Sequence, residues 1–123
     1  MNILIDTHIF LWATSLDPRL KQKHIDLLKS GEHNFYMSAV SVAEIMIKIN
    51  IGKFAFDRDI EAVIKQMRVK ILELEMTDVL ALQTMRRHHN DPFDRMLISQ
   101  SINREFPILT YDKKFPVYDC KLI

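Results

Sequence analysis

Glycine is scarce in this chain, and its scarcity excludes two large classes of α/β enzyme. Only two of the 123 residues are glycine. A dinucleotide-binding fingerprint needs three closely spaced glycines, and a P-loop needs a glycine-rich turn around the phosphates. Neither motif can be built from two glycines. Any catalytic site must therefore rest on other residues.

Cysteine and long apolar runs are also scarce. Cys120 is the single cysteine, so no internal disulfide can form, and we interpret it as a small buried hydrophobe because no base is evident nearby. No basic-then-apolar leader precedes the first expected strand. No apolar run approaches the roughly twenty residues that span a bilayer. We expect a cytoplasmic protein with no membrane partner.

Length and composition fit one globular domain, residues 1–123. Nearly half of the residues are hydrophobic, 27% are charged and the net charge is +1, which is ordinary for a soluble protein. The net charge thus says nothing about partners, although a polyanionic substrate would need local basic residues. The candidates are Lys48, Lys53, Arg86, Arg87 and Arg95; each alone is typical of a solvated surface.

Short apolar stretches alternate with helical patterns along the chain. Expected strands cover residues 2–6, 35–37, 69–74 and 108–111, and the tail 117–122 adds a short edge strand. Expected helices cover 7–14, 22–28, 41–51, 57–67 and 77–85, and another begins at 90–92 and reaches 102. This alternation predicts an α/β fold whose central, mainly parallel sheet of four to five strands is flanked by helices.

Four acidic residues stand where these segments begin or end. Asp6 and Asp112 follow expected strands, and Glu44 and Asp94 fall in the first turns of expected helices. Strand ends and the helix starts that follow them share one edge of a parallel sheet. Carboxylates about 5 Å apart repel by roughly 3 kcal/mol at an effective dielectric near 20, so a cation or a proton is needed to offset the repulsion. The four predict a site for Mg²⁺, which prefers oxygen ligands.

Each acid also has a structural interpretation, which stays open when it is taken alone. Residues 41–44 match a capping box, in which Glu44 reaches back to the N–H of Ser41. Asp91 suits a helix cap, with Asp94 facing the positive end of the helix dipole. Asp6 suits the cap of the helix that starts at residue 7, and Asp112 suits a turn. The joint pattern favours a metal site.

Four segments of the chain resemble the acidic blocks of PIN-domain proteins, especially the VapC-type toxins of toxin–antitoxin pairs. The segments are residues 4–8, 38–45, 89–98 and 109–115. The third is the most specific, since residues 91–95 read Asp-Pro-Phe-Asp-Arg before a run of aliphatic residues. One departure is Ala43, where relatives often carry tryptophan. That change affects packing and leaves the acids in place.

The resemblance implies a metal-dependent endoribonuclease that a cognate antitoxin holds inactive. By matching position, Mg²⁺ or Mn²⁺ would be bound by Asp6, Glu44, Asp94 and Asp112. Thr110 would orient a ligand or water, and Asp91 is interpreted first as the helix cap. RNA hydrolysis would use a metal-activated water and leave a 5′-phosphate and a 3′-hydroxyl.

Other functions fit less well. A phosphoacceptor signalling module would need adjacent acids after the first strand, where this chain has Asp6-Thr7. A catalytically idle PIN scaffold would not need all four acids. His88 and His89 do not make a zinc site, because adjacent side chains diverge and no cysteine lies nearby, and we expect them in a loop facing RNA or solvent. His8 lies close enough in sequence to approach the metal site.

Two expected helices carry more apolar residues than one small sheet needs. These residues are Phe10, Leu11, Trp12, Ile45, Met46, Ile47, Ile49 and Ile51. Exposed apolar surface of this kind is typical of interfaces. We therefore expect a homodimer that also binds an amphipathic antitoxin segment. A basic antitoxin side chain would block the acidic site.

Overall fold

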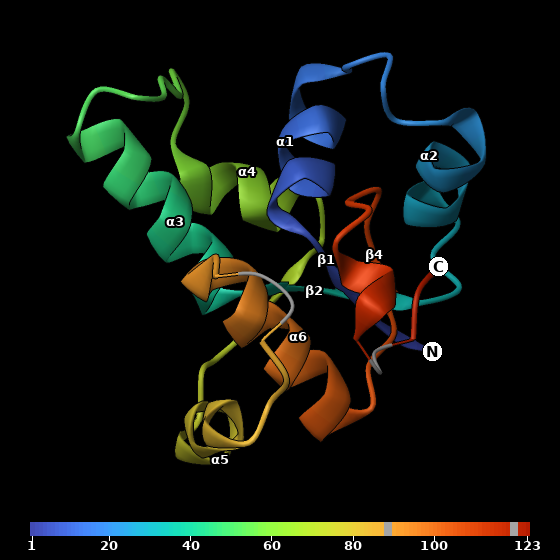
Figure 1. Ribbon diagram of the computed structural model, residues 1–123. Coiled ribbons are helices and arrows are strands. Elements are labelled where there is room, and N and C mark those ends of the chain that lie inside the picture. Colours follow the sequence, from blue (N-terminus) through green and yellow to red (C-terminus); the bar gives the residue numbers. More distant parts are fainter. Residues whose placement is uncertain (88–89, 119–120) are drawn as a thin grey trace.

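The structure is a computed structural model and describes residues 1–87, 90–118 and 121–123. Strands and helices alternate along most of the chain (Figure 1). The strands are β1 (Asn2–Ile5), β2 (Asn34–Ser38), β3 (Lys70–Leu72) and β4 (Ile108–Leu109). The α-helices are α1 (Thr7–Ser15), α2 (Gln22–Lys29), α3 (Ala39–Asn50), α4 (Ile60–Gln66), α5 (Met76–Leu80) and α6 (Pro92–Arg104). Two 3₁₀ helices are η1 (Ala81–Gln83) and η2 (Phe115–Val117).

The four strands form one parallel sheet in the order β3-β2-β1-β4. This confirms the predicted fold class. The tail differs from the prediction: part of it forms η2, and beyond that a single parallel bridge joins Leu122 to Ile108. The described part of the tail thus adds one bridge and no further strand. Cys120 lies outside the described residues.

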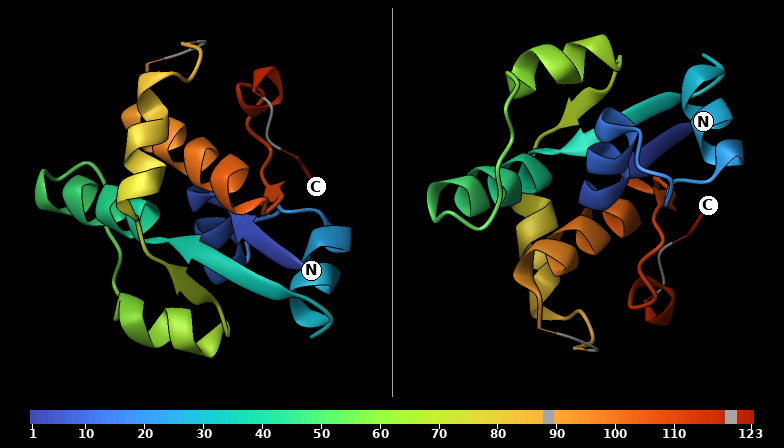
Figure 2. Two further views of the ribbon diagram at one scale, coloured as in Figure 1. Left: turned by 90° about the horizontal axis from the view of Figure 1, so that it is seen from below. Right: turned by 90° about the horizontal axis from the view of Figure 1, so that it is seen from above.

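Helices cover both faces of the sheet. Ile3 and Ile5 of β1 pack with α1, α2, α3 and α4, whereas Leu4 packs with α6 on the opposite face. Figure 2 shows α6 on one side of β1 and β2, with α1 and α4 on the other. Successive strand residues are therefore all buried, which explains why β1 lacks polar alternation. None of the helices within the described residues is long and apolar enough to cross a membrane.

Helix α3 begins earlier than expected. Its N-cap is Ser38, whose hydroxyl accepts from the N–H of Val40 at 3.0 Å. The predicted capping box between Ser41 and Glu44 was therefore wrong, and Glu44 lies in the second turn of α3 instead of the first. The reason is that β2 passes directly into α3 at Ser38 without a loop, and the Ser38 hydroxyl also donates to the buried Gln100 side chain.

Other boundaries were also misplaced. Helix α4 begins at Ile60 instead of residue 57, because the carboxylate of Asp59 accepts from the N–H groups of Glu61 and Ala62 and so caps the helix there. The helix expected over 77–85 ends its α-helical part at Leu80 and continues as η1. Strands β3 and β4 are shorter than predicted. None of these shifts changes the order of the elements.

A buried carboxylate joins α5 to α6. Asp78 is fully buried and accepts from Arg104 at 2.8 Å, from Asn103 at 2.8 Å and from the N–H of Glu75 at 2.9 Å. Burial by itself raises the pKa of Asp78, but these three donors outweigh burial and hold the pKa below its usual value. The carboxylate therefore stays ionised at neutral pH and fixes the outer helix α5 against α6.

We expect Arg104→Met to destabilise the protein. The substitution leaves the buried Asp78 carboxylate without its cation, a loss that ordinarily costs a few kcal/mol. Because Arg104 is 21% exposed and two donors to Asp78 remain, we expect a decrease of about 2 kcal/mol in the free energy of unfolding. Urea denaturation measures this. Lys23→Met, at an exposed site on α2, is the control, and an equal loss in both variants would contradict the explanation.

Candidate metal centre

The strand register places Asp6 beside Thr110. Ile5 pairs with Leu109 in the sheet, and the N–H of Asp6 donates to the carbonyl of Leu109 at 3.1 Å. The Thr110 hydroxyl donates to Asp6 Oδ2 and accepts from the N–H of Asp112 at 3.0 Å. Asp6 also caps α1, since its Oδ1 accepts from the N–H of His8 at 2.6 Å. One threonine thus links two of the four predicted ligands.

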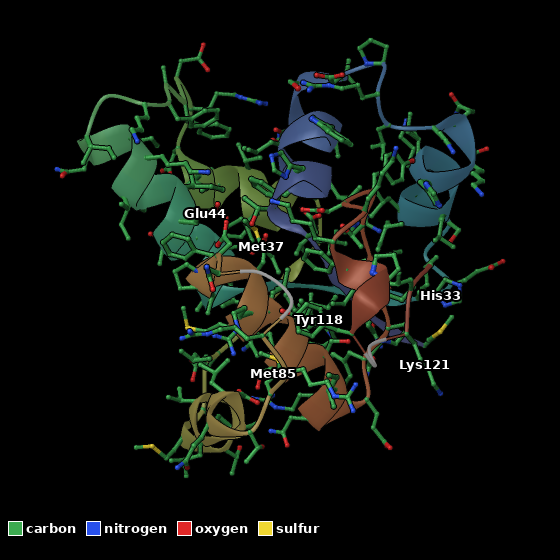
Figure 3. The ribbon with its side chains drawn as sticks, in the orientation of Figure 1. His33, Met37, Glu44, Met85, Tyr118 and Lys121 are labelled. Carbon is green, nitrogen blue, oxygen red and sulfur yellow. The ribbon has the colours of Figure 1, made fainter. Side chains whose placement is uncertain are left out.

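Glu44 reaches the same region from α3. It extends toward the first turn of α1 (Figure 3), where Thr7 Oγ1 donates to its Oε1 at 3.0 Å. Its other oxygen, Oε2, accepts from Lys48 Nζ at 2.9 Å. Glu44 is 7% exposed. Both of its carboxylate oxygens therefore have hydrogen-bond partners in a mainly buried environment. Lys48 offsets the charge of Glu44 here.

Asp94 enters from the N-terminal end of α6. Asp91 caps this helix as expected: its Oδ1 accepts from the N–H groups of Phe93 and Asp94 at 2.9 and 3.3 Å. Pro92 occupies the first turn, where its missing N–H costs no hydrogen bond. Asp94 also lies in that turn, as predicted. The fourth acid, Asp112, accepts from the N–H of Lys114 at 2.9 Å and so forms the turn after β4.

The pKa of Asp94 shows that these acids share one electrostatic environment. Burial is the largest influence, and the charges of neighbouring carboxylates add to it, so that the pKa rises to about 7. The contributing neighbours, in decreasing order of effect, are Asp91, Asp112, Asp6 and Glu44. All of the predicted ligands therefore act on Asp94, although they come from four separate elements.

The carboxylates meet without forming a complete ligand shell. Within residues 1–87, 90–118 and 121–123, no three Asp, Glu, His or Cys side chains are grouped closely enough to hold one ion as they stand. Mg²⁺ nevertheless keeps several waters in proteins and is often held by only one or two carboxylates. The carboxylate oxygens and the negative charge of the groups around Asp94 thus fit a hydrated divalent ion. The ligand assignment stays a prediction.

Two basic side chains adjoin the acids. His8 is largely exposed, and its Nδ1 lies 3.7 Å from Asp6 Oδ1; the hydrogen bond to Asp6 raises the pKa of His8. Arg95 follows Asp94 on α6, and its Nη2 donates to the carbonyl of Met85 at 3.4 Å. The buried Nε of Arg95 has no hydrogen-bond partner. His88 and His89, expected in a nearby loop, lie outside the described residues.

An open cleft of about 670 Å³ borders the acids on one side. It lies between α1, α3 and the segment that connects α3 to α4, and Thr7 and Glu44 form part of its wall. The cleft is mixed in character, with aromatic and aliphatic side chains beside basic ones. Its apolar lining includes Leu11, Trp12, Ile45, Phe54 and Phe56, and its basic lining includes Arg19, Lys48, Lys53 and Arg58.

Two contacts were not recognised in the sequence. Thr7 was not singled out, although it lies next to Asp6 and reaches Glu44 across two helices. No local pattern reveals that contact, because the two residues are 37 positions apart. Lys48 was assigned only to a basic patch. Its spacing of four residues from Glu44 on one helix was a usable signal for the ion pair.

Comparison with known proteins assigns the family. The PIN domain model matches residues 3–120, so the chain belongs to the PIN-domain family. The comparison with curated proteins gave no match.

Solved structures share the fold at low sequence identity. VapBC2 from Rickettsia felis, bound to a promoter DNA fragment, contains a chain with a TM-score of 0.74 and 15% identity, covering 99% of this chain and 96% of its own. A chain of DNA-bound VapBC from Salmonella typhimurium has a TM-score of 0.72 and 14% identity, and the match covers 100% of this chain and 96% of that one. A chain of FitAcB from Neisseria gonorrhoeae has a TM-score of 0.70 and 17% identity, with the same two coverages of 100% and 96%. The PIN fold predicted from the sequence is thereby confirmed.

The raised pKa of Asp94 makes the stability of the metal-free protein depend on pH. Between the ordinary pKa of 3.8 and about 7, the folded protein keeps a proton that the unfolded chain has lost. The free energy of unfolding therefore falls as pH rises through this window, and the contribution is fully lost above it. In Asp94→Asn nothing ionises at this position.

We expect Asp94→Asn to melt at a higher temperature than the wild type at pH 8 in chelator, with the difference shrinking toward pH 4. Thermal melts across this range measure it. The matched control is Asp26→Asn, which removes an exposed carboxylate on α2 and should show no such gain. A constant difference between wild type and Asp94→Asn at every pH would contradict the electrostatic explanation.

Proposed function

We propose that this PIN-domain protein is a metal-dependent endoribonuclease, the VapC-type toxin of a toxin–antitoxin pair. The observation that carries the proposal is the set of neighbouring carboxylates around Asp94: burial first, and then the charges of these neighbours, raise the pKa of Asp94 to about 7. Five acids at one edge of a small sheet are destabilising without a cation, so a structural role alone does not account for them. Similarity to chains of VapBC and FitAcB supports the toxin assignment.

Asp6, Glu44, Asp94 and Asp112 would hold Mg²⁺ or Mn²⁺. When bound, such an ion supplies a water of lowered pKa and positive charge against the phosphate. Thr110 orients Asp6 through its hydroxyl and ties Asp112 to the same point. Lys48 donates to the other side of Glu44 and would compete with an ion for that carboxylate. Asp94, with its pKa near 7, would lose its proton when an ion binds, so ion binding should strengthen as pH rises.

We expect the purified protein to cleave single-stranded RNA with Mg²⁺ or Mn²⁺ and to stop in excess chelator. Asp94→Asn should abolish cleavage. Thr110→Val should reduce it about 10- to 100-fold, the usual loss when a group that orients a ligand is removed, whereas Thr110→Ser keeps the hydroxyl and most of the activity. Gel analysis of a labelled RNA measures each rate.

A thermal melt separates a loss of ion binding from a loss of folding. An ion at one hundred times its dissociation constant stabilises the folded state by about 2.7 kcal/mol. Millimolar Mn²⁺ should raise the melting temperature of the wild type and leave the double variant Asp6→Asn with Asp94→Asn unchanged. Activity that persists in chelator, or in Asp94→Asn purified in the same way, would overturn the proposed mechanism.

The antitoxin would bind in the cleft between α1 and α3. A lining that combines apolar side chains with basic and acidic ones suits an amphipathic segment of a short partner. Glu44 lies in the wall of this cleft, so a basic antitoxin side chain placed there would meet the acids and exclude the ion. Phe10 and Ile45 contribute less than expected from the sequence, because they are 0% and 2% exposed and belong to the core.

Homodimerisation would use the exposed apolar residues of α3 and α5. On α3 these are Met46, Ile47 and, at its end, Ile51, which are 39%, 47% and 56% exposed; on α5 they are Met76, Val79 and Leu80, at 70%, 40% and 61%. Both helices pack against α6, and Figure 1 shows them on the side away from α2. A second copy of the chain would remove this surface from water.

We expect Ile47→Glu to convert a dimer into a monomer, because the contact would bury a charge on each copy. Light scattering at micromolar concentration measures the mass. Leu16→Glu places the same charge at a more exposed apolar site, 83% exposed at the end of α1, and should leave the dimer intact. A wild-type protein that scatters only as a 14.5 kDa species would exclude the dimer.

A further inference from the structure

Four aromatic rings form a continuous row beside the carboxylates. The row consists of His8, Trp12, Tyr111 and His24. Neighbouring ring centroids are 5.8 Å apart for His8 and Trp12, 5.6 Å for Trp12 and Tyr111, and 5.2 Å for Tyr111 and His24. The row crosses from α1 over the segment that follows β4 to α2. His8 is exposed, Trp12 and Tyr111 are partly exposed, and His24 is buried.

Two cations lie over the rings of this row. The Arg19 guanidinium is 4.8 Å from the Trp12 ring centroid, and Lys21 Nζ is 5.6 Å from that of Tyr111. Arg19 is 67% exposed and also pairs with Asp17 at 2.7 Å, which holds its guanidinium in place. Lys21 is exposed as well. Aromatic rings and positive charges thus lie together along one strip of surface.

The row begins at the candidate metal centre. His8 Nδ1 lies 3.7 Å from Asp6 Oδ1, and Tyr111 stands between Thr110 and Asp112 in the chain. The far end of the row is fixed to α2, where the Tyr111 hydroxyl contacts His24 Nδ1 and accepts from the N–H of Lys21 at 3.0 Å. An RNA strand that ran from the carboxylates in this direction would meet the rings and the cations in turn.

We propose that this row binds the single-stranded RNA next to the cleaved phosphate. The inference deepens the proposed function and rests on it. Bases stack on the partly exposed Trp12 and Tyr111 rings, while Arg19 and Lys21 meet the phosphates between them. Aromatic platforms flanked by cations are the usual solution for binding single strands without reading their sequence. The positive charges complement a polyanion at a place where the neighbouring acids would otherwise repel it.

Anchoring of the Thr110–Asp112 segment explains only part of this arrangement. That role accounts for the Tyr111 hydroxyl and for the burial of His24. It does not need a second ring at Trp12 or cations over these two partly exposed rings. His8, Trp12 and Arg19 also line the cleft assigned to the antitoxin, so the partner and the RNA would compete for these side chains.

The single tryptophan gives a direct test. Trp12 is the only tryptophan in the chain, so its fluorescence reports on the surroundings of this one ring, which belongs to the row and also lines the cleft. The probe is an unstructured RNA of about twelve nucleotides, added to Asp94→Asn in chelator so that no cleavage occurs. We expect saturable quenching of Trp12 by the single strand and little by the same sequence in a duplex, whose bases are already stacked.

Variants separate the row from general charge. The double variant Arg19→Ala with Lys21→Ala should weaken RNA binding about tenfold and flatten its dependence on salt. Lys29→Ala removes one exposed charge from α2 away from the rings and should change it little. Trp12→Leu, followed by anisotropy of labelled RNA, should weaken binding about 5- to 100-fold, and Trp12→Phe should restore most of it.

Two results would overturn the proposal, in different ways. RNA that binds by anisotropy without quenching Trp12, or that quenches equally as a duplex, would place the strand elsewhere while leaving the nuclease function intact. RNA that neither binds the variant nor is cleaved by the wild type with Mn²⁺ would remove the proposed function together with the row. Quenching by the single strand that is lost in the double cation variant and kept in Lys29→Ala would establish it.

Discussion

The hydroxyl of Thr110 connects residues from early and late in the sequence at the place where the acids meet. It donates to Asp6, 104 positions away in the sequence, and accepts from the N–H of Asp112. This contact depends on the parallel pairing of β1 with β4, which sets Asp6 and Thr110 side by side at the sheet edge. A shift of one residue in that register would turn one of the two side chains to the opposite face and separate them.

Several negative charges lie close together at the sheet edge, and their repulsion has to be offset by other contacts. Each acid has a local partner that stabilises it: Asp6 caps α1, Glu44 pairs with Lys48, and Asp112 closes a turn. For Asp94, burial and the charges of the neighbouring carboxylates are not offset in this way, and its pKa rises to about 7. In the proposed function, stability and cation binding would be linked, since the repulsion that weakens the fold would also favour a bound ion.

Polar and apolar surfaces around the acids divide the molecule into zones. The cleft beside α3 has apolar and charged side chains, the row over α1 and α2 combines rings with cations, and the exposed faces of α3 and α5 are aliphatic. The first two zones share Trp12 and both reach the carboxylates. In the proposed function, a partner in the cleft would therefore contact both the acids and the aromatic row.

Much of the local structure followed from the sequence. The order of strands and helices, the capping role of Asp91 and the placement of Asp94 in the first turn were predicted, because apolar periodicity and caps are local signals. The start of α3 was not. Residues 41–44 have the pattern of a capping box, but the direct passage from β2 into α3 gave the cap to Ser38, whose hydroxyl also reaches Gln100 on α6.

What the sequence by itself determined is the set of acids, the order of the elements that carry them and the PIN fold. Only the tertiary structure decided how they interact: which threonine binds which carboxylate, that Glu44 faces Thr7 and Lys48, and that Asp94 bears the summed charge of its neighbours. The physical reason is range. Caps and apolar faces arise from residues a few positions apart, whereas electrostatic coupling at a sheet edge depends on strand register and packing across the whole chain.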